Sequence, residues 1–237
     1  LHAFIPNEGD AWTYTLDWLG RYFGRILSRK NEIQETPTVP SFLSESAFQE
    51  IPGLFQELIS GVYLEMIGLL GKRTAELHLA MSSETEDMSF APEPFSVSYQ
   101  RSHYQSMQSL TKRVFLLLNK NVKNLPDNLK GLAGEILHRE KEIMDRFRGI
   151  LRKRISAMKI RIHGDYHLGQ VLYTGNDFFI IDFEGELART LSDRRLKRSP
   201  LRDIPSMIRS LRYATYAALS KYTPITPEDI PVLEHWS

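Results

Sequence analysis

Two short segments near residue 170 carry carboxylate and amide side chains at spacings that could support chemistry. The first runs from Arg161 to Tyr173 and contains Asp165, which is followed five residues later by Gln170. The second runs from Phe178 to Glu186 and places Asp182 directly after an apolar run. A carboxylate, an amide and a second carboxylate in this order are the residue types that phosphoryl transfer from a metal-bound nucleotide requires.

Each of these side chains has a role that its chemistry suits. A hydroxyl that attacks a phosphoryl group must be oriented and must lose its proton, and the carboxylate of Asp165 can accept that proton. Mg²⁺ prefers hard oxygen ligands and typically takes one or two protein carboxylates together with phosphate oxygens. Asp182 offers a carboxylate and Gln170 a carbonyl oxygen, so these two residues are the predicted metal ligands. The predicted cofactors are ATP and Mg²⁺.

Short strands are expected to position these groups. The pattern predicts strands over Ile160–His163, Gln170–Tyr173 and Phe178–Asp182, and residues 174–177 carry a turn signal. Pairing of the last two strands would bring Gln170 close to Asp182.

The motifs resemble those of a known family. The strings HGDYHLGQ (163–170) and IDFEGE (181–186) resemble the aminoglycoside-phosphotransferase-like kinases. Within that group, the resemblance is greatest to the maltokinases, because of the Gln at the end of the first string, the string DFEGE and the later SPLRDI (199–204). The resemblance implies an ATP-dependent sugar kinase that converts maltose to maltose 1-phosphate and is fused to, or works beside, a trehalose synthase. It also implies an α+β, mostly α fold, the C-terminal lobe of a protein-kinase-like fold with small β-hairpins at the active site.

The same resemblance implies roles for further residues. Residues 1–9 resemble the hinge that follows the small lobe, which would put backbone groups of His2, Ala3 and Phe4 at the adenine edge, with Leu172 and Ile181 facing the adenine ring. The remaining substrate-contacting or supporting positions are His163, His167, Glu184, Arg202 and Asp203.

Those supporting positions differ in expected role. His163 would brace the catalytic loop, and His167 could face the acceptor sugar. Glu184 would support the metal through water or lie in the loop after Asp182. Asp203 would hold backbone amides of the catalytic loop from the start of a helix beneath it.

Several alternatives remain open from the residues alone. An aminoglycoside, choline or homoserine kinase would use the same three residues. The two aspartates could be turn or cap residues. His163, Asp165 and His167 could form the metal cluster of a hydrolase. A non-catalytic binding domain on a kinase scaffold is the reading from another class, and loss of Asp165 or Asp182 would be its hallmark.

Composition restricts the protein class. The 237 residues are 42% hydrophobic and 25% charged, with a formal net charge of +1 and no cysteine. The charge gives no bulk electrostatic case for nucleic acid or membrane binding, and the absence of cysteine excludes disulfides and thiolate chemistry. No apolar run approaches the roughly 18 residues of a membrane helix. A cytoplasmic location is expected.

Most of the chain is predicted to be helical. Asp10 is a candidate cap for a helix with Leu16, Leu19, Phe23, Ile26 and Leu27 on one face. Further helices are expected over 54–80, with Leu58, Val62, Ile67 and Leu70 buried and His78 in the core, and over 101–120, 129–150 and 201–219. Residues 35–40 and 82–94 are predicted loops, and the basic segment 189–202 is a predicted surface loop.

The predicted domain organisation is a single lobe over residues 1–237. A complete kinase of this type needs a small lobe with a phosphate-covering loop and a lysine. No G-x-G-x-x-G pattern occurs in the sequence. The small lobe is therefore expected to be absent from this chain, which would leave the isolated chain inactive.

Overall fold

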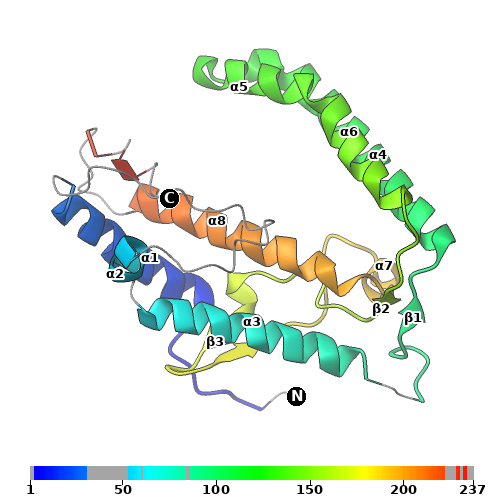
Figure 1. Cartoon of the computed structure of the whole chain (residues 1–237), viewed down its shortest axis with the longest axis horizontal. Helices are drawn as coiled ribbons and strands as arrows, with labels where there is room; N and C mark the ends of the chain where they lie inside the picture. The colour runs from blue at the N-terminus through cyan, green and yellow to red at the C-terminus, as the bar shows by residue number, and fades with distance from the viewer. Residues whose placement is uncertain are drawn as a thin grey trace. The chain divides into compact units, whose positions relative to one another are not determined.

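A computed structural model describes residues 3–30, 53–59, 61–83, 86–221, 228–229 and 232–233. The chain divides into two compact units, one formed by residues 1–91 and 160–237 and the other by residues 92–159. The described elements are helices with two small antiparallel two-stranded sheets, as the sequence predicted (Figure 1). His2 and the loop predicted over residues 35–40 lie outside the described residues.

The first helix, α1 (Ala11–Ser28), forms as predicted. The Asp10 side chain accepts a hydrogen bond of 2.8 Å from the backbone N–H of Thr13, which is an N-cap. The predicted apolar face is confirmed, because Leu16, Leu19, Phe23 and Ile26 are buried and Leu27 is partly buried.

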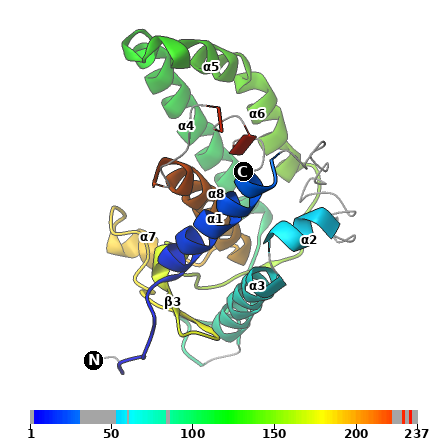
Figure 2. The ribbon, with the colours of Figure 1, turned by 90° about the vertical axis from the view of Figure 1, so that its left-hand side faces the viewer.

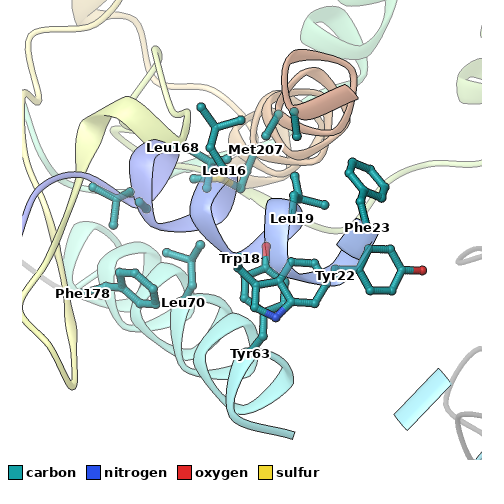
Figure 3. Packing of buried hydrophobic residues seen from close by; sticks show 14 of the residues in the cluster. Leu16, Trp18, Leu19, Tyr22, Phe23, Tyr63, Leu70, Leu168, Phe178 and Met207 are labelled. Carbon is teal, nitrogen blue, oxygen red and sulfur yellow. The ribbon is translucent and has the colours of Figure 1, made fainter. Parts of the chain in front are cut away.

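Aromatic rings join α1 to the next two helices, α2 (Gly53–Ile59) and α3 (Gly61–Met81). The rings of Trp18 and Tyr63 stack with centroids 3.8 Å apart, and the Trp18 indole N–H donates to the carbonyl oxygen of Ile59 at 2.9 Å. Figure 3 shows this packing and its continuation to Leu70 and Phe178. Two separate helices thus replace the single one predicted over 54–80.

The predicted buried face of that segment was partly wrong. Leu58 and Leu70 are buried, whereas the side chain of Val62 is 65% exposed. Tyr63 takes the inward position instead and stacks on Trp18. An aromatic ring buries more apolar area than valine. The face of α3 that turns inward is therefore the one that places Tyr63 against Trp18 of α1.

The helix α8 (Asp203–Lys221) packs against α1 (Figures 1 and 2). Besides Asp203 at its first position, its buried residues are Met207, Ser210, Ala214 and Ala218, which form one stripe; three of these four are small, which allows close approach of the two backbones. The helix predicted over 201–219 begins later, because Leu201 lies in a 3₁₀ turn, Pro200–Arg202, and is 71% exposed.

A hairpin of β3 (Val171–Tyr173) and β4 (Phe178–Ile180) follows the 3₁₀ turn Leu168–Gln170. Val171 pairs with Ile180 and Tyr173 with Phe178. Gln170 and Asp182, predicted as strand residues, lie just outside the strands. The strand predicted over 160–163 was wrong, because only Ile160 pairs, in an isolated bridge with Arg198.

The unit of residues 92–159 is built on the helices α4 (Val97–Asn121), α5 (Asp127–His138) and α6 (Glu140–Arg148), with a 3₁₀ turn at Val122–Asn124 and another at Gly149–Leu151. The strands β1 (Glu93–Pro94) and β2 (Met158–Lys159) pair at its base. Two helices therefore replace the single one predicted over 129–150. The predicted loop 189–202 contains a five-residue helix, α7 (Leu191–Arg195).

Candidate active site

The loop that carries Asp165 turns sharply at a glycine. Gly164 has φ = +83°, a conformation that side chains with a Cβ rarely adopt. A Cβ at Gly164 would lie 3.5 Å from the Cα of Gly185, which itself has φ = +74°. The loop of Asp165 and the segment after Asp182 thus approach each other through two glycines.

His163 ties these two segments together and is buried. Its Nδ1 accepts a hydrogen bond of 3.3 Å from the backbone N–H of Asp165, so the ring hydrogen is on Nε2, which donates to the carbonyl oxygen of Ile181 at 2.8 Å. Both ring nitrogens are therefore engaged by backbone atoms, and neither is available as the metal ligand that a hydrolase cluster would need.

Asp203 lies beneath the same loop at the start of α8 and is 1% exposed. Its carboxylate accepts 3.1 Å hydrogen bonds from the backbone N–H groups of His163 and Gly164, which is the contact that the sequence suggested. The sequence did not suggest its third partner, His78 of α3, whose Nε2 lies 3.0 Å from Asp203 Oδ2.

Two further side chains fasten the loop to helices. The hydroxyl of Tyr166 lies 2.6 Å from Thr74 Oγ1, and because Thr74 donates its own proton to the carbonyl oxygen of Leu70, Tyr166 is the donor. Burial raises the pKa of the Tyr166 hydroxyl to about 12, although its hydrogen bond with Thr74 opposes that shift. The backbone N–H of Leu168 donates to the Ser210 hydroxyl of α8 at 3.1 Å.

The carboxylate of Asp165 remains accessible on this braced loop. Its side chain is 41% exposed, and Oδ2 lies 4.0 Å from His167 Nε2. His167 Nδ1 accepts from the backbone N–H of Gly169 at 3.1 Å, which leaves the ring hydrogen on Nε2, toward Asp165. An accessible carboxylate with a donor beside it can receive a proton from a bound hydroxyl.

Asp182 has φ = +63°, the only positive φ among the described non-glycine residues. Such a conformation is uncommon for a non-glycine residue and is often associated with functional sites. Its Oδ2 accepts a 3.0 Å hydrogen bond from the Gln170 amide, so the two predicted metal ligands are neighbours. A carboxylate and an amide oxygen fit Mg²⁺ chemistry once phosphate oxygens complete the coordination.

The residues after Asp182 contact the basic segment. The carbonyl oxygen of Glu184 accepts from an Arg194 guanidinium nitrogen at 3.2 Å, while the Glu184 side chain is 74% exposed. The aliphatic part of Arg194 covers Gly185, where a Cβ would meet its Cγ at 3.5 Å. Arg202 lies in the turn that precedes α8.

The residues predicted to contact the nucleotide are more exposed than those of the loop that carries Asp165. Phe4 is 85% exposed, and Ala3 is also exposed. Leu172 and Ile181 are half-buried on and just after the hairpin. The segment of residues 3–9 contacts the β3–β4 hairpin at Glu8, whose backbone N–H donates to the carbonyl oxygen of Tyr173 at 2.8 Å.

A cavity of about 430 Å³ opens beside Asp165. Besides the loop residues, it is lined from the start of α1 and from one face of α8. The lining residues are Asp10, Trp12, Asp165, Tyr166, His167, Gly169, Ser206, Arg209, Ser210 and Tyr213. Trp12, Arg209 and Tyr213 were not predicted as site residues. Trp12 lies on α1 and the other two lie on α8, so no local pattern in the sequence connects the three.

Comparison with known proteins gives a relative and a fold. A stretch of 97 residues, 40% of this chain and 24% of the relative, is 31% identical to the glucosamine kinase of Mycolicibacterium smegmatis (strain ATCC 700084 / mc(2)155). A crystal form of a glucosamine kinase superposes with a TM-score of 0.61 at 16% identity, covering 98% of this chain and 43% of that one. A glucosamine kinase in complex with glucosamine, ADP and inorganic phosphate gives 0.61 at 15% identity, covering 98% and 44%. No protein-family profile matches the chain.

These likenesses confirm the predicted fold class, a mostly helical chain with small hairpins consistent with the large lobe of a kinase fold. The chain is related in sequence to a glucosamine kinase over part of its length, and it spans less than half the length of the proteins it matches. None of the helices in the described ranges has the length and apolar character needed to cross a membrane.

Proposed function

We propose that the segments 160–186 form the active site of an ATP-dependent sugar kinase. The observation that carries the proposal is the accessible carboxylate of Asp165, which stands at the cavity on a loop braced by buried groups. A loop held from beneath by Asp203 and from the side by Tyr166 keeps the base in a fixed position, which proton abstraction requires. The likeness to glucosamine kinases supports the same class of reaction.

In the proposed mechanism, a sugar hydroxyl bound in the cavity faces Asp165 and gives its proton to the carboxylate as it attacks the terminal phosphoryl group of ATP. The bond between that phosphorus and the bridging oxygen breaks, and ADP leaves. His167 Nε2–H lies on the same side and can donate to a sugar oxygen. Asp182 and Gln170 would hold Mg²⁺. When bound, the cation offsets phosphate charge and keeps the transferred group in line.

Maltose is the proposed acceptor. It rests on the strings DFEGE and SPLRDI, which are most similar to the maltokinases. The cavity volume lies in the range usual for small-molecule sites. An association with a trehalose synthase belongs to the same proposal. Glucosamine is the second candidate acceptor, because the matched relative is named a glucosamine kinase.

The non-catalytic alternative is less well supported. Asp165 and Asp182 are both present, and Asp182 keeps an unfavourable backbone conformation beside Gln170. Strain of this kind persists where the surrounding structure enforces it, which is common at functional sites.

The proposal is tested by an ADP-release screen with the complete gene product, MgATP and a panel of acceptors. The panel holds maltose, glucose, glucosamine, an aminoglycoside, choline and homoserine, with an acceptor-free reaction as the control. We expect ADP release above the control with a sugar, and the sugar phosphate as the second product. Release with choline or homoserine alone would overturn the sugar assignment, and release with none of them would overturn the kinase.

A further inference from the structure

One face of α8 lines the cavity beside Asp165. Ser206, Arg209, Ser210 and Tyr213 recur at helical spacing on this face. The Ser210 hydroxyl is already used to hold Leu168 in the catalytic loop. This face of α8 therefore contacts both the loop of Asp165 and the cavity, so a charged side chain on it would act on a bound acceptor.

Arg209 supplies a charge that the described part of the protein leaves unpaired. The residue is exposed, and its guanidinium makes no hydrogen bond or ion pair with any described residue. The only other fully charged side chains lining the cavity are the carboxylates of Asp10 and Asp165.

The charge of Asp10 is largely occupied by its own helix. Its Oδ1 accepts the backbone N–H of Thr13 at 2.8 Å, and it caps the N-terminus of the 18-residue helix α1, where the helix dipole offsets a negative charge. An ammonium group on a ligand would therefore find Arg209 as an uncompensated like charge and Asp165 as its available counter-ion.

Pairing with Asp165 would itself be unproductive. The carboxylate must face the attacking hydroxyl to take its proton, and an ammonium group in that place would hold the base in an ion pair. Of the three charges in the cavity, Arg209 thus acts against a cationic acceptor by repulsion and Asp165 by misorientation, while Asp10 is held by its helix cap.

The aromatic residues of the cavity suit an uncharged sugar. Tyr213 is 60% exposed and Trp12 is half-buried, and both line the cavity. The C–H faces of a pyranose pack on such rings without needing a counter-charge.

We propose that this cavity takes a neutral sugar, and that Arg209 is a specificity-determining residue that disfavours amino sugars. The inference rests on the proposed function, and it separates this chain from the acceptor named for its glucosamine kinase relative.

The test compares kcat/KM for the best neutral sugar of the screen with kcat/KM for glucosamine, in the wild-type gene product and in three variants. Arg209→Gln removes the charge, Arg209→Lys keeps it, and Arg212→Gln removes a neighbouring exposed charge that does not line the cavity. We expect the wild type to prefer the neutral sugar by at least about tenfold, since repulsion and misorientation both contribute.

Arg209→Gln should narrow that preference by about two- to fivefold, as befits a solvent-screened charge, while Arg209→Lys and Arg212→Gln leave it unchanged. Raising the salt concentration should narrow the wild-type preference and not that of Arg209→Gln, because salt screens the repulsion. A wild-type enzyme that prefers glucosamine, or equal effects of Arg209→Gln and Arg212→Gln, would overturn the inference and leave the kinase standing. Failure to phosphorylate any sugar would instead refute the proposed function, and this inference with it.

Discussion

At the scale of single residues, Asp182 combines an unusual backbone with an exposed carboxylate. Its φ of +63° lies two positions after the end of β4, and its side chain accepts a hydrogen bond from the Gln170 amide. A carboxylate contributes charge as well as a ligand oxygen to a cation, whereas an amide contributes a dipole alone. The two proposed ligands should therefore be unequal.

We predict that Asp182→Ala removes Mg²⁺-dependent nucleotide binding and that Gln170→Ala weakens it less. Calorimetric titration of the gene product with ADP, in the presence and in the absence of Mg²⁺, measures both effects. Asp182→Asn is the matched control for the backbone, because Asn tolerates a positive φ several-fold better than most residues. Equal losses for the Ala variants, or full binding by Asp182→Ala, would contradict the assigned roles.

Asp203 illustrates a residue whose importance comes from what it holds. Its buried carboxylate accepts two backbone N–H groups of the loop that carries Asp165 and lies beside His78. An amide in its place could accept only through one oxygen and would turn an N–H group toward a donor. Removing one partner of a buried hydrogen bond costs about 1–3 kcal/mol.

We predict that Asp203→Asn lowers the free energy of unfolding by about 1–3 kcal/mol and also lowers kcat. Urea denaturation and steady-state kinetics on the same preparation check the two effects. His78→Gln, which leaves both backbone contacts of Asp203 in place, should cost less in each. A His78→Gln variant as damaged as Asp203→Asn would show that the histidine contact dominates.

At the scale of elements, a bidentate ion pair links the β3–β4 hairpin to α3. Arg73 Nε donates to Asp177 Oδ1 at 2.8 Å and a terminal nitrogen donates to Oδ2 at 2.6 Å. Arg73 lowers the pKa of the Asp177 carboxyl, and the pKa of Arg73 is raised in return. The contact fixes the turn end of the hairpin whose opposite end carries Gln170.

We predict that Arg73→Gln loosens the hairpin, lowers Tm and weakens nucleotide affinity. Lys72→Gln should have a smaller effect on each, because Lys72 acts on Asp177 through its charge and not through a hydrogen bond. Because the carboxyl pKa of Asp177 is lowered on folding, the stabilisation is complete above the ordinary carboxyl pKa of about 4 and is lost as the pH falls through the folded value. The Tm difference between wild type and Arg73→Gln should therefore shrink in acid. A difference independent of pH down to 3 would exclude this origin.

At the scale of the whole chain, three buried tyrosines are expected to make the unit formed by residues 1–91 and 160–237 sensitive to alkaline pH. Burial raises the pKa values of Tyr22, Tyr63 and Tyr166 to about 12. A raised folded pKa means that stability is fully present below the unfolded value near 10 and is lost as the pH rises toward the folded one.

We predict that stability falls between pH 10 and 12 by up to about 1.4 kcal/mol per pH unit for each of these tyrosines. Tyr166→Phe should reduce that slope, because one of the groups whose pKa burial raises no longer titrates. Urea denaturation at intervals from pH 8 to 11.5 gives both slopes. An unchanged slope in Tyr166→Phe would mean that this hydroxyl titrates normally in the folded protein.

How far the sequence predicted this fold depended on the range of the interaction involved. The Asp10 cap and the buried face of α1 follow from residues a few positions apart, and both are confirmed. Val62 was wrongly placed in the core because the inward face of α3 is decided by stacking on Trp18. The contact of His78 with Asp203 joins residues that are 125 positions apart in the sequence, and no local pattern predicts it.

The candidate site shows the same division. The order of Asp165, Gln170 and Asp182 is legible in the chain because these residues lie on adjacent short elements. The cavity is not legible, since Trp12, Arg209 and Tyr213 meet only when α1 packs on α8. We propose that those three residues take part in acceptor choice, and no motif in the sequence marks them, so the sugar was predicted from the family resemblance alone.

The central claim is that Asp165 is the proton acceptor of a sugar kinase, and the most direct measurement compares wild-type and Asp165→Asn gene products. Phosphoryl transfer from ATP to the best sugar and the affinity for MgADP are measured on the same preparations. We predict that Asp165→Asn lowers kcat by about 10²–10⁴ and leaves MgADP affinity within about twofold, because Asp165 lines the cavity and the proposed metal ligands Gln170 and Asp182 do not. Turnover by Asp165→Asn within a few-fold of wild type would contradict the account.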